Sequence, residues 1–237
     1  MKHLITIVIL LITTNGIQAQ NPMEDQNLNK QQQSIVILSA LTATGNIEQL
    51  KVQLNKGLDD GLTINEIKEL LVQLYAYCGF PRSLNGINTF MAVLEERKAK
   101  GIGDTDGKAA TPVNDHDKYQ TGKKNLQTLT GREEQTLSGA NAFAPEIDSF
   151  LKEHLFADIF SRDVLTFQQR ELVTVAALAA MTGVAQQLQA HVGMAMNTGL
   201  KEEQFKVAFA IIDTAVNKTQ GDLARATLEK VVAAKKQ

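Results

Sequence analysis

Apolar residues recur every three to four positions in several stretches of the chain, which is the spacing of one face of an α-helix. Thr63 stands three residues before Glu66, the spacing of a capping box that starts a helix. In the stretch 100–122 the apolar pattern stops, and glycine, aspartate and asparagine dominate, which predicts a linker. The predicted helices cover residues 35–41, 47–58, 64–77, 87–94, 144–156, 167–181, 185–196, 202–216 and 223–233.

The first residues of the chain follow a pattern of their own. A short positive start, Met1 to His3, precedes an apolar run at 4–12, and the small residue Ala19 stands before Gln20. This order is typical of a secretory signal peptide at residues 1–19, with an amphipathic or buried first helix as the alternative. We therefore expect a periplasmic or secreted protein. No later stretch approaches the roughly 20 apolar residues of a membrane helix, so we expect no membrane association after cleavage.

The two halves of the chain align without a gap at a constant offset of 138 residues, so that Gly45 falls on Gly183 and Gly61 on Gly199. Each glycine would end a helix at the same phase, where a left-handed residue costs little. A chance match of two helical segments is the alternative to an internal duplication, which we favour. The chain then divides into a signal peptide at 1–19, a first repeat at 28–98, a linker at 100–122 and a second repeat at 131–235.

Several motifs are similar to those of one protein family. The second repeat contains Arg170-Glu171-Leu172, Leu188-Gln189-Ala190-His191 and Ala195-Met196-Asn197-Thr198-Gly199, and the first contains Tyr75-Ala76-Tyr77-Cys78-Gly79-Phe80-Pro81. These segments resemble the R-E-L helix, the L-x-x-H helix, the A-x-N-x-G turn and the Y-x-G-x-P helix end of the carboxymuconolactone decarboxylase family, within the alkylhydroperoxidase D-like superfamily. The resemblance implies an all-α fold in which a tandem repeat of the family's helical units forms a pseudo-dimeric bundle. It also implies further self-association into oligomers.

The two repeats depart from the family pattern in complementary ways. In the first repeat, Gln33 and Gln53 occupy the positions of Glu171 and His191, so this degenerate copy has neither ionisable group. The second repeat in turn lacks the tyrosines, glycine and proline of the helix end. The resemblance therefore implies one composite site, with an acid–base pair from the second repeat and a tyrosine-lined wall from the first.

Glu171 and His191 are the catalytic candidates that the resemblance implies. An imidazole exchanges a proton near neutral pH, and a neighbouring carboxylate can orient it. If Gly183 is the bend of a helical hairpin, the two residues differ in height by about 6 Å at 1.5 Å per residue. A glutamate side chain and a helix crossing angle can close this gap. The alternative is that Glu171 pairs with Arg170 or caps a helix, and that His191 is an ordinary interface histidine.

The resemblance adds five candidates for substrate contact, Tyr75, Tyr77, Cys78, Pro81 and Arg162. The two tyrosines lie two positions apart on a helix, so they cannot both face one pocket. Arg162 either binds a substrate carboxylate in bidentate fashion or forms a surface ion pair. Cys78 is either a nucleophile or, as we favour, a small hydrophobic residue in a packed helix.

Composition excludes several other kinds of chemistry. Cys78 is the only cysteine, so the C-x-x-C pair of the peroxidase branch is absent and a two-cysteine peroxidase mechanism is excluded. The four histidines form no cluster in the sequence, and we expect neither a metal nor another cofactor. The net charge of -2 comes without a basic block, which makes a nucleic-acid partner a poor fit.

The resemblance favours a cofactor-independent lyase or isomerase, of the carboxy-lyase type, with a small carboxylated or lactone-like molecule as substrate. Because the family's role in aromatic degradation is cytoplasmic, the signal peptide argues against that pathway here. One alternative is a noncatalytic small-ligand-binding or scaffold protein that keeps the fold. A further alternative is a one-cysteine redox protein that uses Cys78.

Overall fold

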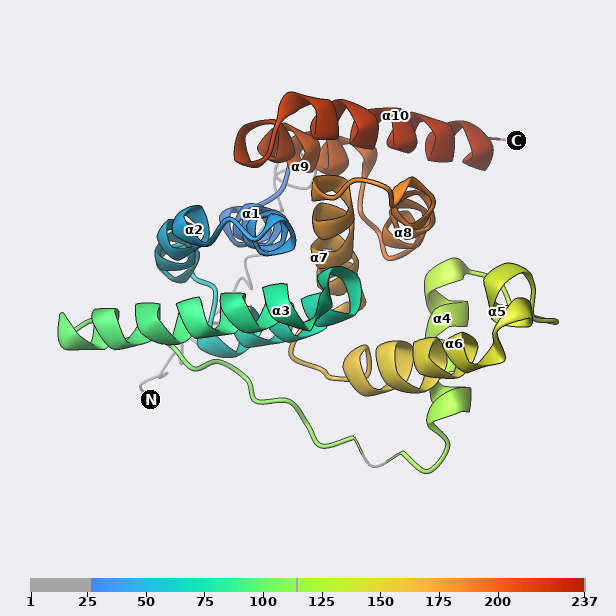
Figure 1. The fold of residues 1–237 in the computed structure, drawn as a ribbon, viewed down its shortest axis with the longest axis horizontal. Coiled ribbons are helices and arrows are strands. Elements are labelled where there is room, and N and C mark those ends of the chain that lie inside the picture. The colour runs from blue at the N-terminus through green and yellow to red at the C-terminus, as the bar shows by residue number, and fades with distance from the viewer. Residues whose placement is uncertain (1–26, 114, 237) are drawn as a thin grey trace, which may run out of the picture.

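The computed structural model describes residues 27–113 and 115–236, and within this part all regular elements are helices (Figure 1). The predicted signal peptide at 1–19 lies outside the described residues. Among the described helices, none is long and apolar enough to cross a lipid bilayer. The helices are α1 (Lys30–Thr44), α2 (Ile47–Asp59), α3 (Ile64–Ala99), α4 (Lys118–Thr130), α5 (Gly139–Phe143), α6 (Pro145–Ser149), a π-helix (Phe150–Ile159), α7 (Phe167–Ala180), α8 (Ala185–Asn197), α9 (Glu202–Ala215) and α10 (Lys218–Lys235).

The glycines that the repeat alignment singles out end their helices or turns in the left-handed conformation. Gly45 and Gly183 have φ values of 74° and 79°, and Gly61 and Gly199 have φ values of 98° and 102°. Other residues rarely adopt this conformation, because a Cβ atom would crowd the backbone. The matching angles confirm that the two repeats turn at the same positions.

The helix order also repeats at the same offset. Helix α2 at 47–59 falls on α8 at 185–197. Helix α3 is interrupted at Gly79 (φ 83°, ψ 157°), and its second half folds back on the first, where the Ser83 hydroxyl donates a hydrogen bond to the Leu71 carbonyl. The two halves of α3 therefore correspond to α9 and α10, and the duplicated all-α architecture is confirmed.

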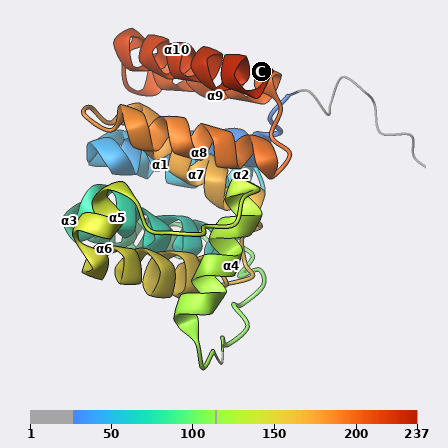
Figure 2. The same ribbon diagram turned by 90° about the vertical axis from the view of Figure 1, so that its right-hand side faces the viewer.

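The equivalent helices α1 and α7 pack against each other at the centre of the molecule. Helix α1 of the first repeat also contacts α9 of the second, and α7 contacts α3, so the contacts between the repeats are reciprocal. Figure 2 shows the resulting layers, with α9 and α10 on one side of α1 and α7 and with α3 on the other. One continuous core of aliphatic residues runs through both repeats.

Between the repeats lie α4 to α6 and the π-helix, which the apolar pattern predicts only in part. The residues at 101–113 are free of helix, and α4 begins at Lys118, within the stretch 100–122 that the sequence analysis predicts as a linker. Helix α4 packs closely on the π-helix because Gly122 has no side chain, and a Cβ atom there would lie 1.8 Å from the Lys152 carbonyl oxygen. A glycine contact leaves no apolar periodicity in the sequence, so the pattern does not indicate this helix.

Candidate functional site

Glu171 and His191 are brought together by two neighbouring helices of the second repeat. A capping box between Thr166 and Gln169 starts α7 and places Glu171 in its second turn, while His191 lies in the middle of α8. The imidazole Nδ1 lies 2.9 Å from a carboxylate oxygen of Glu171. With the carboxylate ionised, Nδ1 is the donor in this hydrogen bond, and in a neutral imidazole Nε2 is then the acceptor.

The pair is almost completely enclosed. The Glu171 side chain is fully buried, and 10% of the His191 side chain is exposed. The second carboxylate oxygen of Glu171 is buried and has no hydrogen-bond partner among the described residues. A buried polar atom without a partner is costly, and such atoms concentrate where a protein performs chemistry.

Tyr77 reaches this pair from the first repeat. Its ring meets the imidazole of His191 edge-on, with the centroids 5.4 Å apart and an interplanar angle of 81°. The Tyr77 hydroxyl is buried and has no partner within hydrogen-bonding geometry among the described residues. The nearby Thr174 hydroxyl donates to the Arg170 carbonyl and accepts from Gln73. Burial, and secondarily the Glu171 carboxylate, raises the pKa of Tyr77 well above its usual value, so the phenol stays protonated at neutral pH.

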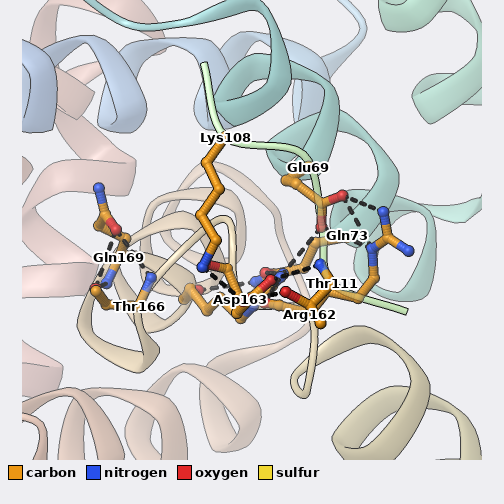
Figure 3. A network of polar contacts seen from close by, with 9 residues as sticks. Glu69, Gln73, Lys108, Thr111, Arg162, Asp163, Thr166 and Gln169 are labelled. Atoms are coloured by element: carbon orange, nitrogen blue, oxygen red, sulfur yellow. Dashed lines mark hydrogen bonds and ion pairs between the residues drawn. The ribbon is translucent and has the colours of Figure 1, made fainter. Parts of the chain in front are cut away.

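Tyr77 ends a polar stripe on α3 that begins with Glu69 and continues with Gln73. These residues are four positions apart, so they project from one face of the helix, the face that meets α7. Glu69 accepts hydrogen bonds from Arg162 at 2.6, 2.9 and 3.0 Å (Figure 3). It also accepts a hydrogen bond from Arg170 at 3.1 Å. Burial raises the pKa of Glu69, but hydrogen bonds from Arg162 and then Arg170 outweigh it and hold that pKa below its usual value.

Gln73 ties the same network to the backbone of α7. Its amide nitrogen donates to the Arg170 carbonyl at 2.8 Å, and its amide oxygen accepts from the Arg170 guanidinium at 2.9 Å. Both side chains are completely buried. The network fixes the start of α7, and therefore the position of Glu171, against α3. The sequence analysis missed Glu69 and Gln73, although a polar residue at every fourth position of an apolar helix could have indicated them.

The remaining predicted residues lie elsewhere or are engaged with other partners. Tyr75 stacks on Phe80 with ring centroids 4.4 Å apart, on a face of α3 different from that of Tyr77. Pro81 is exposed just after the Gly79 break. The thiol of Cys78 donates to the Leu74 carbonyl at 3.2 Å, and burial raises its pKa, which disfavours the reactive thiolate.

The Arg162 guanidinium holds Glu69 in bidentate fashion, through Nε and one terminal nitrogen. Its side chain is 41% exposed, whereas that of Glu69 is 6% exposed, so the pair lies at the edge of the buried network. In the part of the chain that is described, no three His, Cys, Asp or Glu side chains gather as potential metal ligands.

A second apolar cluster covers the site from outside. It is built by α4, the π-helix and the residues after it, and Tyr77, Phe167 and Met194 pack against it. The first repeat has no such cover among the described residues, and there Gln33, the counterpart of Glu171, is exposed. The helices between the repeats therefore enclose one of two equivalent positions.

Comparison with known proteins identifies the family of the chain. The model of the carboxymuconolactone decarboxylase family matches the chain twice, at residues 18–90 and 145–229. No curated protein matches the chain significantly. The two matches lie on the two structural repeats and together cover more than half of the chain, so the protein belongs to the carboxymuconolactone decarboxylase family as a tandem-repeat member.

Proposed function

We propose that the protein is a cofactor-independent lyase or isomerase that acts on a small carboxylated or lactone-like molecule. The observation that carries this proposal is the enclosed hydrogen bond of 2.9 Å between His191 and Glu171. Family membership supports it, because the chain keeps an imidazole and a carboxylate together in one repeat after the other repeat has replaced both by glutamine.

In this proposal His191 is the general acid and base. In an isomerisation, Nε2 of the neutral ring takes a proton from one substrate carbon and returns it at another carbon. In a decarboxylation no C–H proton is removed, and the ring, protonated beforehand from water, donates its Nε2 proton to the carbon that loses carbon dioxide. The electron pair of the broken C–H or C–C bond moves into the conjugated carbonyl of the substrate. Glu171 holds Nδ1–H and stabilises the imidazolium that forms.

Tyr77 supplies the complementary donor. A carbonyl that receives the electron pair develops negative charge on oxygen, and a hydrogen bond placed there lowers the barrier. The Tyr77 hydroxyl is protonated and buried without a partner beside His191, which suits it to that oxygen. An environment nearly free of water strengthens both interactions.

Proton exchange in D2O tests the proposal across a whole class of candidate substrates. The protein is incubated with a panel of small unsaturated lactone carboxylates and β-keto acids, and NMR follows deuterium incorporation, isomerisation and loss of carbon dioxide. His191→Gln should lower the rate of the active compound by roughly a hundredfold to ten-thousandfold. Glu171→Gln should lower it less.

The chain provides a matched control in His154, an exposed histidine whose Nδ1 lies 3.0 Å from Asp158. His154→Gln removes the same kind of pair without affecting the enclosed site, and turnover should be unchanged. Equal losses in His154→Gln and His191→Gln would contradict the proposal. Binding of a panel compound without any exchange would instead favour a noncatalytic binding protein, and a loss caused by Cys78→Ser alone would favour redox chemistry.

We also propose export and self-association, on the N-terminal pattern at 1–19 and on family resemblance. The protein recovered from the periplasm or the medium should begin at Gln20 by mass spectrometry. An intact N-terminus in the cytoplasmic fraction would contradict export. Sedimentation equilibrium tests self-association.

A further inference from the structure

A cavity of about 650 Å³ lies between the two halves of α3, apart from the His191 site. This volume is within the range of pockets that hold small organic ligands, about 300–1,000 Å³. Its wall is mostly apolar, and the lining contains neither Glu171 nor His191. The apolar wall is formed by Leu71, Val72, Ile87, Phe90, Met91, Leu94, Ala109, Ala110, Pro112 and Val164.

Positive charge is in excess at this cavity. Lys68 lines it and, among the described residues, forms no ion pair. Arg162 also lines it, and shares the single carboxylate of Glu69 with Arg170. Arg162 uses Nε and one terminal nitrogen for Glu69, so its other terminal nitrogen is left without a hydrogen bond to the described residues. An apolar cavity with two cationic side chains that still have unpaired N–H donors is complementary to an anion that carries an apolar body.

The stretch after α3 forms one wall of the cavity and is held in place at both ends. The carbonyls of Thr105 and Asp106 accept hydrogen bonds from the first backbone amides of α3. Further along, Asp163 accepts hydrogen bonds from the Thr111 amide and hydroxyl and pairs with Lys108 (Figure 3). The strap at 109–112 is therefore positioned before any ligand binds, which lowers the entropic cost of binding.

The second repeat contains the equivalent groove with different chemistry. Lys206, the counterpart of Lys68, is paired with Glu202 and Glu203, and Glu229 replaces Met91. In that groove the counterpart of Lys68 is already paired, and an acidic group stands where the first groove has an apolar one. Among the described residues, a lysine without an ion pair at this position, beside Met91 rather than a glutamate, is thus particular to the first repeat.

We propose that the cavity between the halves of α3 binds a small amphipathic carboxylate, with its head group at Lys68 and Arg162 and its apolar body between Val72 and Met91. This site is independent of the acid–base chemistry at His191. The strap at 109–112 covers the apolar body. A second copy of the chain on the same face is the competing occupant, which the experiment distinguishes.

Isothermal titration calorimetry with octanoate tests the proposal on the full-length mature protein, with 1-octanol as the uncharged counterpart. Octanoate should bind more tightly than 1-octanol. Lys68→Gln should weaken octanoate binding by about five- to tenfold, because one charged contact is lost, and leave 1-octanol unchanged. Lys206→Gln, the same substitution in the second repeat, should change neither affinity.

Met91→Glu introduces the residue that the second repeat has at 229. It should weaken the binding of both octanoate and 1-octanol by more than about tenfold. Lys68 and Met91 are both exposed, with Met91 at 55%, so neither substitution should disturb folding, which circular dichroism checks. The expected pattern must persist in His191→Gln, which separates this site from the proposed catalysis.

Three outcomes would overturn the proposal. The first is an absence of octanoate binding, and the second is equal weakening by Lys68→Gln and Lys206→Gln. The third is that the wild type sediments as an oligomer, that Met91→Glu dissociates it, and that octanoate does not bind. This combination would show that the face is a subunit interface.

Discussion

The contact between the two repeats has a polar side and an apolar side. Where α3 meets α7, three polar residues at every fourth position face a buried arginine. Helix α9, which contacts α1, carries partly buried apolar residues of the core at the equivalent positions. The polar residues are Glu69, Gln73 and Tyr77, and their counterparts at an offset of 138 are Val207, Ile211 and Ala215.

This difference shows that the fold does not require the polar network. The apolar side packs the equivalent helices without it, and buried ion pairs are seldom more stabilising than apolar residues of similar volume. The network instead accompanies the hydrogen-bonded pair of His191 and Glu171, because Arg170 directly precedes Glu171 on α7. We infer that its role is to hold the site in one geometry.

The largest effect is expected from Glu69→Val, which copies Val207 into the polar side. Arg170 is completely buried and would lose its counter-charge, so the free energy of unfolding should fall by about 3–5 kcal/mol. Urea unfolding followed by circular dichroism measures this loss. Adding Arg170→Gln, the residue of the first repeat at position 32, should restore part of the stability by removing the unpaired charge.

Glu203→Val is the control for this comparison. It removes a carboxylate from an exposed ion pair with Lys206 and should cost less than about 1 kcal/mol. If Glu69→Val cost no more than the control, the buried network would not carry the energetic difference between the two sides.

The second effect concerns the cover over the site. Gly122→Ala would place a Cβ atom 1.8 Å from the Lys152 carbonyl oxygen, so α4 must shift away from the π-helix. We expect a loss of roughly 1–3 kcal/mol and weaker hydrogen-exchange protection of α4. Gly193→Ala is the control, because nothing lies within 4 Å of the position that its Cβ atom would take, and alanine favours helix by about 1 kcal/mol. Unchanged protection of α4 in Gly122→Ala would contradict this packing.

The helices that sequence pattern predicted well are those with a buried apolar face. The predicted ranges 47–58, 167–181 and 185–196 differ from α2, α7 and α8 by at most one residue at either end. Helix α1 starts at Lys30 rather than at residue 35, because a capping box between Asn29 and Gln32 begins it with polar residues. Such a first turn has no apolar periodicity, so the pattern alone could not find it.

The site was predictable where a local motif carries it. Glu171 and His191 are part of motifs that resemble the family, and the repeat offset identified the glutamines that replace them. Glu69 and Arg170 meet across 101 positions of sequence, and neither belongs to a motif that predicts the contact. Which side chains pair across helices depends on packing, and a single sequence does not contain that information directly.

A third, smaller effect is expected in acid, where protonation of Glu69 should lower the free energy of unfolding. The pKa of Glu69 is held below its usual value of 4.5 in the folded protein. A carboxylate whose folded pKa is lowered contributes stability above its unfolded pKa, and this contribution is lost as pH falls below it. The wild type should therefore lose stability more steeply below about pH 4.5 than Glu69→Gln, measured by urea unfolding across pH. Parallel curves would contradict the assignment.

The smallest effect on stability, and the sharpest on function, is expected from Tyr77→Phe. The hydroxyl is buried without a partner among the described residues, so its removal should leave stability unchanged or raise it by about 1 kcal/mol. The edge-on ring contact with His191 remains. Turnover should fall by about a hundredfold or more if the hydroxyl donates to a developing oxyanion. A destabilised variant would show that the hydroxyl has a structural partner. Unchanged turnover would show that Tyr77 only lines the site and that its hydroxyl takes no part in the reaction. A variant that is at least as stable but slower would show that the polar side keeps this hydroxyl for chemistry, which its counterpart Ala215 cannot perform.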